Sequence, residues 1–206
     1  DASLSVLETI ADESVRRGDR SLALNAAREI VEHFSETDGV LGAQMMLARD
    51  AMEREAFDEA ERRLIFVRDR FASRPDAAEA LLLLGDLYRR TYDLDASDEA
   101  YRRVLGVKAW RRRWPEALYG RGETARAGRD YAAAAAMYER IYVLYGHYRD
   151  WVAKAYLARA DCLRRLREYE KAAETLREML ALPDLADRPE RKEAETLLRT
   201  LKGRMS

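Results

Sequence analysis

A period of about 37 residues is the feature that most constrains how this chain can fold. When the sequence is shifted against itself, the stretches "AFDEAERRL", "DYAAAAAMY" and "EYEKAAETL" fall into register, each with an aromatic residue three positions before an alanine. Equivalent positions are Ala23, Ala60, Ser97, Ala134 and Ala172, separated by 37, 37, 37 and 38 residues. A fixed period of this size is typical of repeat arrays, in which each unit buries its apolar face against its neighbours.

Each unit has the pattern of α-helices. Apolar residues recur at helical spacing, as in Leu81, Leu84 and Leu87, and no alternating apolar and polar segment reaches the length of a strand. Turn-forming residues interrupt the helical segments at Gly18-Asp19, Thr37-Asp38-Gly39, Arg74-Pro75-Asp76, Tyr92-Asp93, Trp114-Pro115, Gly128-Arg129, Gly146 and Leu182-Pro183. The sequence therefore predicts an all-α chain of paired helices.

The repeat resembles the tetratricopeptide repeat family, whose unit is two antiparallel helices with the pattern W-x2-L-G-x2-Y, then A-x3-F, then P. The third unit matches best, with Leu81, Leu84, Gly85, Tyr88, Ser97 and Tyr101, and the fourth follows with Leu118, Gly122, Ala125, Ala134 and Tyr138. Small residues such as Gly122 let two helix backbones approach closely. Arg121 and Arg159 depart from the pattern. They are the seventh residues of the fourth and fifth units and stand where the pattern has its leucine.

The resemblance implies a right-handed, tetratricopeptide-repeat-like α-solenoid. We expect one repeat domain over residues 1–206, with five helix-turn-helix repeats at about 4–40, 41–77, 78–114, 115–152 and 153–186. Residues 188–203 are more polar, with Ala194, Leu197, Leu198 and Leu201 on one face, and are predicted to form a capping helix over the last repeat.

Composition argues against several classes of function. The chain has 37 Lys and Arg against 38 Asp and Glu, a net charge of -1, so no overall field attracts nucleic acid or anionic lipid. No apolar run is long enough for insertion into a membrane. A single cysteine, Cys162, and two histidines, His33 and His147, offer no recognisable metal-ligand spacing. We therefore predict no catalytic residue, cofactor or metal site.

Two local motifs have a structural and a functional interpretation. The basic stretch "KAWRRRWPE" is predicted to be a junction, in which Lys108 to Arg113 end the second helix of the third unit and Trp114-Pro115 start the fourth; a binding patch is the alternative. "GRGETA", at residues 120–125, fits the loose dinucleotide pattern, but that pattern requires a preceding strand, so packing of Gly122 is favoured.

Charged residues three or four apart recur on the first helix of each unit. They are Asp12 with Arg16, Arg49 with Glu53, Asp86 with Arg89 and Arg90, Glu123 with Arg126, and Asp161 with Arg164 and Arg165. The family resemblance implies that such positions face a concave groove, which receives an extended peptide or a helix of another protein. A solvated face with weak intrahelical ion pairs is the alternative.

Apolar residues on the same helices favour the binding interpretation, because Met and Tyr are adaptable anchors at interfaces. The predicted partner-binding residues are Met45, Arg49, Met52, Leu82, Asp86, Arg89, Arg90, Tyr119, Glu123, Arg126, Leu157, Asp161, Arg164 and Arg165. The lysine and asparagine clamp that some family members use for chaperone tails is missing, which disfavours that partner.

We therefore predict a non-catalytic scaffold for protein-protein interaction, with an acidic protein or peptide as partner. The alternative is a self-association module within a larger bacterial envelope protein, in which Tyr142, Tyr145 and Tyr148 pack against a second copy. An enzyme would need perturbed titratable groups in a closed pocket. The style of the repeats resembles bacterial envelope and periplasmic proteins, which implies a periplasmic location, with the cytoplasm as the alternative.

Overall fold

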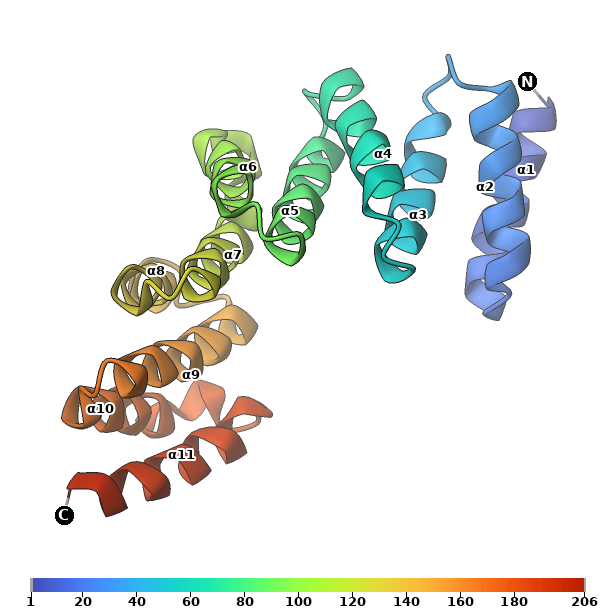
Figure 1. The fold of residues 1–206 in the computed structure, drawn as a ribbon. Helices are drawn as coiled ribbons and strands as arrows, with labels where there is room; N and C mark the ends of the chain where they lie inside the picture. Colours follow the sequence, from blue (N-terminus) through green and yellow to red (C-terminus); the bar gives the residue numbers. More distant parts are fainter. Residues whose placement is uncertain (1, 206) are drawn as a thin grey trace. The chain divides into compact units, whose positions relative to one another are not determined.

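A computed structural model describes residues 2–205, and all regular elements within that range are helical (Figure 1). The α-helices are α1 (Ala2–Arg17), α2 (Arg20–His33), α3 (Val40–Glu53), α4 (Phe57–Arg70), α5 (Pro75–Arg90), α6 (Leu94–Gly106), α7 (Trp114–Ala127), α8 (Tyr131–Leu144), α9 (Arg149–Arg165), α10 (Tyr169–Ala181) and α11 (Glu190–Met205). Two short 3-10 helices, η1 (Lys108–Arg113) and η2 (Pro183–Leu185), complete the described range. The predicted all-α repeat fold is confirmed.

Contacts show the predicted pairing for α1 with α2, α3 with α4, α7 with α8 and α9 with α10, and α11 follows as the last helix. The chain divides into two compact units, Asp1–Leu87 and Tyr88–Ser206, so the predicted single repeat domain stays a prediction. In the first unit α2 packs between α1 and α3, and α3 packs on α4. In the second unit each helix from α6 to α11 packs on the next, and the first helices α7, α9 and α11 are also in contact along the series.

The turn inside each repeat has the same backbone conformation. One residue between the two helices has a left-handed φ: Gly18 (76°), Glu55 (59°), Tyr92 (66°), Arg129 (62°) and Arg167 (64°). In three repeats the next residue is an aspartate, Asp19, Asp93 or Asp130, whose side chain accepts a hydrogen bond from a backbone N–H in the first turn of the second helix. The repeat period therefore includes the turn as well as the helices.

Small residues allow close packing within the second unit, as the sequence predicts. A Cβ atom at Gly122 would lie 2.5 Å from the ring of Tyr138, which is fully buried. Gly120 faces the buried ring of Tyr101 in the same way. Glycine at these positions of α7 leaves room for the two tyrosine rings to pack directly against the helix backbone.

The two arginines that depart from the family pattern join neighbouring repeats. Arg121 on α7 donates to Asp98 on α6 (2.6 Å), and Arg159 on α9 donates to Glu139 on α8 (3.0 Å). Each arginine thus pairs a first helix with the second helix of the preceding repeat. The departure from an apolar residue is compensated by an ion pair between repeats.

One predicted boundary is wrong. Residues Lys108–Arg113 do not continue the second helix of the third repeat, because α6 ends at Gly106 and Val107 is extended before η1. Trp110 is buried, and Trp114 donates its indole N–H to the carbonyl of Val104 (3.1 Å). The stretch is an inter-repeat junction, and α7 begins at Trp114 as expected.

Candidate interaction surfaces

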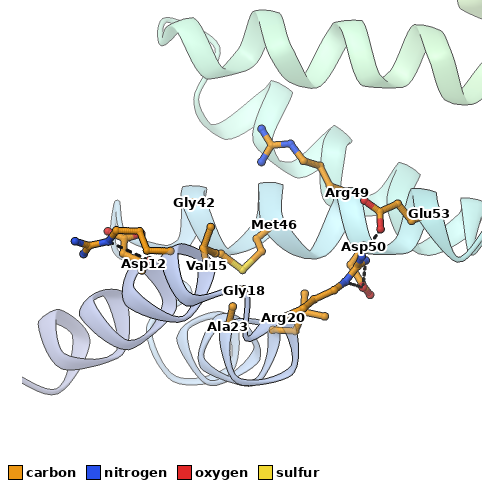
Figure 2. Close-up of a pocket in the computed structure, with 12 residues that line it drawn as sticks. Asp12, Val15, Gly18, Arg20, Ala23, Gly42, Met46, Arg49, Asp50 and Glu53 are labelled. Carbon is orange, nitrogen blue, oxygen red and sulfur yellow. Dashed lines mark hydrogen bonds and ion pairs between the residues drawn. The ribbon is translucent and has the colours of Figure 1, made fainter.

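The first unit has an open pocket of about 720 Å³ between its first helices, α1 and α3, and the start of α2 (Figure 2). Its lining residues are Asp12, Val15, Arg16, Gly18, Arg20, Ala23, Leu24, Gly42, Met46, Arg49, Asp50 and Glu53. Figure 2 shows Val15 and Met46 close together at the centre, with charged side chains around them. The pocket therefore combines an apolar centre with a charged rim, as binding pockets commonly do.

An ion-pair network closes one side of this pocket. Arg20 on α2 donates to Asp50 (2.6 Å) and to Glu53 on α3, and Arg54 donates to the other oxygen of Asp50 (2.7 Å). Burial disfavours the charged form of the Asp50 carboxylate, but the hydrogen bonds from Arg20 and Arg54 outweigh it and hold its pKa below the ordinary value. Asp50 and Glu53 are thus already occupied by arginines of the protein.

The other rim charges are more exposed, and their pairing differs from the prediction. Arg16 pairs with Glu13 (3.3 Å) rather than with the Asp12 carboxylate, and Arg49 pairs with Glu79 on α5 rather than with Glu53. The side chains of Arg16 and Arg49 are 70% and 49% exposed. Helical spacing alone did not identify these partners, because a neighbouring helix offers Arg49 a carboxylate.

A second candidate surface lies on the first helices of the second unit. The Tyr119 ring on α7 contacts Tyr138 and Trp151, with ring centroids 5.2 and 5.4 Å apart. Glu123 accepts hydrogen bonds from the Tyr138 hydroxyl (2.7 Å) and from Arg126 (2.7 Å), as the spacing of Glu123 and Arg126 predicts. Burial and the Glu123 charge raise the pKa of Tyr119 to about 12. Tyr119 is therefore part of a fixed aromatic cluster.

The same surface continues along α9. Asp161 accepts hydrogen bonds from Arg164 (2.5 Å) and Arg165 (3.1 Å), so these predicted pairs are present. Leu157 is partly buried against the core. The Lys154 ammonium lies 4.8 Å from the centroid of the Trp151 ring.

A smaller pocket of about 360 Å³ lies at the start of α9. Its lining residues are His147, Tyr148, Arg149, Asp150, Trp151 and Arg188. Arg188 pairs with Asp150 and with Asp187 (2.8 Å), so its charge is already neutralised by two carboxylates.

Three predicted binding residues lie in the core. Met45, Met52 and Leu82 are only 4%, 7% and 4% exposed, so in this structure they stabilise the helix packing and are not available at the surface. On α5, Asp86 and Arg89 are partly buried and Arg90 is exposed. The accessible part of the predicted set is therefore mainly charged.

Sequence reasoning missed several of the residues that form the first pocket, among them Val15, Arg20, Gly42 and Asp50. Arg20 lies on a second helix, outside the row that the family resemblance indicated. Gly42 could have been found by comparing repeat positions, since its equivalents are Glu79, Glu116 and Lys154.

The remaining candidates have structural roles or no arrangement for chemistry. Cys162 is buried, and burial raises the pKa of its thiol to about 11, which makes it a poor nucleophile at neutral pH. Within residues 2–205, no three or more His, Cys, Asp or Glu side chains are grouped to hold a metal ion. In the same range, no helix combines the length and apolar character that crossing a bilayer requires.

Solved structures share the fold at low sequence identity. The structure titled "Crystal structure of MamA protein" matches with a TM-score of 0.66 and 16% identity, over 96% of this chain and 94% of that one. The apo form of RapI matches with a TM-score of 0.75 and 13% identity, over 89% of this chain and 55% of that one. Yeast Tom70 matches with a TM-score of 0.69 and 16% identity, over 98% of this chain but only 40% of its own length. At such identities the likeness shows the fold alone.

No curated protein sequence matches the chain. Family models described as tetratricopeptide repeat match residues 45–110, 116–147 and 153–183, together more than half of the chain. These segments fall on helices α3 to α10 of the structure. The chain therefore belongs to the tetratricopeptide repeat family.

Proposed function

We propose that this protein is a non-catalytic scaffold that binds a peptide or helix of a partner protein on the face formed by the first helices of its repeats. The fold is generally one for protein-protein interaction. The observation that carries the proposal is the pocket between α1 and α3, where apolar side chains lie within a charged rim. A bacterial envelope protein is the proposed context, on the resemblance of its repeat style.

The test begins with capture of partners from cells that produce the protein, followed by measurement of binding with the purified components. Reversing Arg89, Arg90 and Arg126 to Glu changes the first-helix face of the second unit, and should weaken binding of an acidic partner by about tenfold or more. The matched control reverses Arg102, Arg140 and Arg177, which are exposed on the second helices α6, α8 and α10.

Both triple variants change the net charge equally, so a general electrostatic effect would weaken them equally. If only the variant with substitutions on the first helices loses binding of the partner, the result supports the proposal. Equal affinity of both variants and the parent, with helical content intact, would move the functional surface away from these helices.

A second candidate function is self-association, favoured by two exposed apolar residues at the end of α8. Val143 is 65% exposed and Leu144 is 56% exposed. Tyr142, which the sequence places in such an interface, stacks on Tyr156 of the same chain with ring centroids 3.9 Å apart. Light scattering decides this: a dimer that Val143→Glu dissociates supports it, whereas a monomer at all concentrations removes it.

A further inference from the structure

Gly42 lines the pocket in the first unit, and a Cβ atom added there would meet open space. The equivalent positions in the next repeats hold Glu79, Glu116 and Lys154. Each of these long side chains makes a contact, Glu79 with Arg49, Glu116 with Arg113, and Lys154 with the Trp151 ring. Gly42 has no side chain to make such a contact, and it borders the open pocket between α1 and α3 (Figure 2).

Packing of the fold does not require this glycine. A Cβ atom at Gly42 would meet no atom within 4 Å, and the position has no left-handed φ. Glycine is also a weaker helix former than alanine. Gly42 weakens its helix and makes no close contact. Residues that go against local helix preference in this way are expected mainly at functional sites, which favours a functional role for Gly42.

The centre of the pocket is apolar where later repeats are charged. Val15 is 57% exposed, and its equivalents from the third repeat onward are Arg89, Arg126 and Arg164. Met46 is partly buried beside it, and Leu24 lies within the lining. An apolar side chain of a ligand could therefore cover Val15 and Met46 and remove them from water.

The charges that remain available on the rim favour a ligand with carboxylates. Asp50 and Glu53 are held by Arg20. Arg16 makes two longer contacts, to the backbone carbonyl of Asp12 (3.4 Å) and to Glu13 (3.3 Å), and Glu13 also pairs with Arg17 at 2.8 Å. Exposed ion pairs of this kind contribute little, so Arg16 and Arg49 can exchange partners at low cost. The opposing charge on the rim is Asp12, which an acidic ligand must avoid.

From these contacts we infer that the pocket binds an acidic segment of a partner protein by one large apolar side chain. That side chain lies over Gly42 against Val15 and Met46, and flanking carboxylates pair with Arg16 and Arg49. The inference rests on the proposed function and adds to it the chemistry of the bound segment.

Three labelled 12-residue peptides test the inference. They share a central pair of leucines and differ only in the flanking residues, which are glutamate, glutamine or lysine. Fluorescence anisotropy with the full chain should give the tightest binding for the glutamate peptide and the weakest for the lysine peptide. Preference for the lysine peptide, or binding of none of the three, would overturn the inference.

Gly42→Gln tests the site, because it adds a neutral side chain to the open pocket. Binding of the glutamate peptide should weaken about tenfold or more, as removal of a main anchor contact typically does, while the thermal midpoint stays the same or rises. Gly106→Gln is the matched control, since Gly106 lies at the end of α6 with no atom within 4 Å of an added Cβ. Asp12→Asn should tighten binding severalfold.

Unchanged peptide binding in Gly42→Gln would place the peptide elsewhere and contradict the inference. A different result tests the proposed function. If a captured natural partner binds equally well to Gly42→Gln but is lost on reversal of Arg89, Arg90 and Arg126, the scaffold function stands and this pocket is not its site.

Discussion

Four residues that are not glycine adopt a left-handed backbone at the turn inside a repeat. Arg129 is one of them, with a φ of 62° and an exposed side chain. A Cβ atom in this conformation lies too close to the backbone, which costs about 1 kcal/mol, whereas glycine avoids the cost. Gly18 holds the equivalent position in the first repeat.

We therefore expect Arg129→Gly to raise the free energy of unfolding by about 0.5–1 kcal/mol. Urea denaturation measures the change. Arg129→Ala removes the same side chain but keeps the Cβ atom, so it should give no such gain. If both substitutions stabilise equally, the effect comes from loss of the arginine and not from relief of the backbone.

Asp50 should be the residue of the first unit whose removal is most costly among the rim charges. Its side chain is 7% exposed and accepts hydrogen bonds from Arg20 and Arg54. Asp50→Asn removes the negative charge but keeps the size, and we expect it to lower the free energy of unfolding by about 2 kcal/mol at pH 7. Glu32→Gln, an exposed carboxylate-to-amide change on α2, should have little effect.

The same substitution should change how far the free energy of unfolding falls at acidic pH. Because the folded pKa of Asp50 lies below its ordinary value near 3.9, its contribution is fully present above that value and is lost as the pH falls toward the folded pKa. Denaturation series at pH 7 and pH 3 should therefore show a smaller loss on acidification in Asp50→Asn than in the parent. An equal loss in both would contradict the assignment.

At the scale of helices, α7 is an element with a tight packing constraint, because Gly120 and Gly122 both face buried tyrosine rings. Gly122→Ala would place a methyl group against the ring of Tyr138, whose hydroxyl is fixed on Glu123. Overpacking of this kind typically costs about 1–3 kcal/mol, and we expect a loss in that range. Gly106→Ala provides the control in α6, where the added methyl group meets no atom within 4 Å and should be neutral or stabilising.

The helices and their pairing could be predicted from the sequence because the pattern is local and repeats. The spacing of Ala23, Ala60, Ser97, Ala134 and Ala172 indicated which residues share a buried helix face, and these positions are buried. The 3-10 helix η1 could not be predicted, since nothing local distinguishes a continued helix from an extended Val107 followed by a buried Trp110.

The charged pairs show where a helical pattern stops being informative. Glu123 with Arg126 and Asp161 with Arg164 pair within one helix as expected. Arg49 and Glu53 do not pair with each other, because Glu79 on α5 and Arg20 on α2 supply partners from neighbouring helices. Spacing predicts which side chains can meet on one helix, but the competing partner depends on how helices pack.

At the scale of the whole molecule, the candidate pocket depends on three helices and a missing side chain. Val15, Arg20 and Gly42 come from α1, α2 and α3, so no single stretch of sequence contains the site. The period helped with the fold because every repeat obeys it. The pocket was harder to predict because Gly42 is where one repeat differs from the others.

A repeat protein in which each helix contacts mainly its neighbours should also respond locally to damage. In the second unit α7 contacts α6, α8 and α9, whereas in the first unit α1 packs on α2, α2 on α3 and α3 on α4. The strain that Gly122→Ala introduces should therefore increase local unfolding of α7 and its neighbours first. It should leave the opening of α1 to α3 nearly unchanged.

Hydrogen exchange followed by mass spectrometry measures this response helix by helix. With Gly122→Ala, we expect amides of α7, α8 and α9 to exchange faster, by roughly tenfold for each 1.4 kcal/mol of local destabilisation. Amides of α1, α2 and α3 should keep the rates of the parent, and Gly106→Ala should change neither group. A uniform increase across both groups would mean that the chain unfolds as one cooperative body, because damage to α7 would then reach the helices of the other unit.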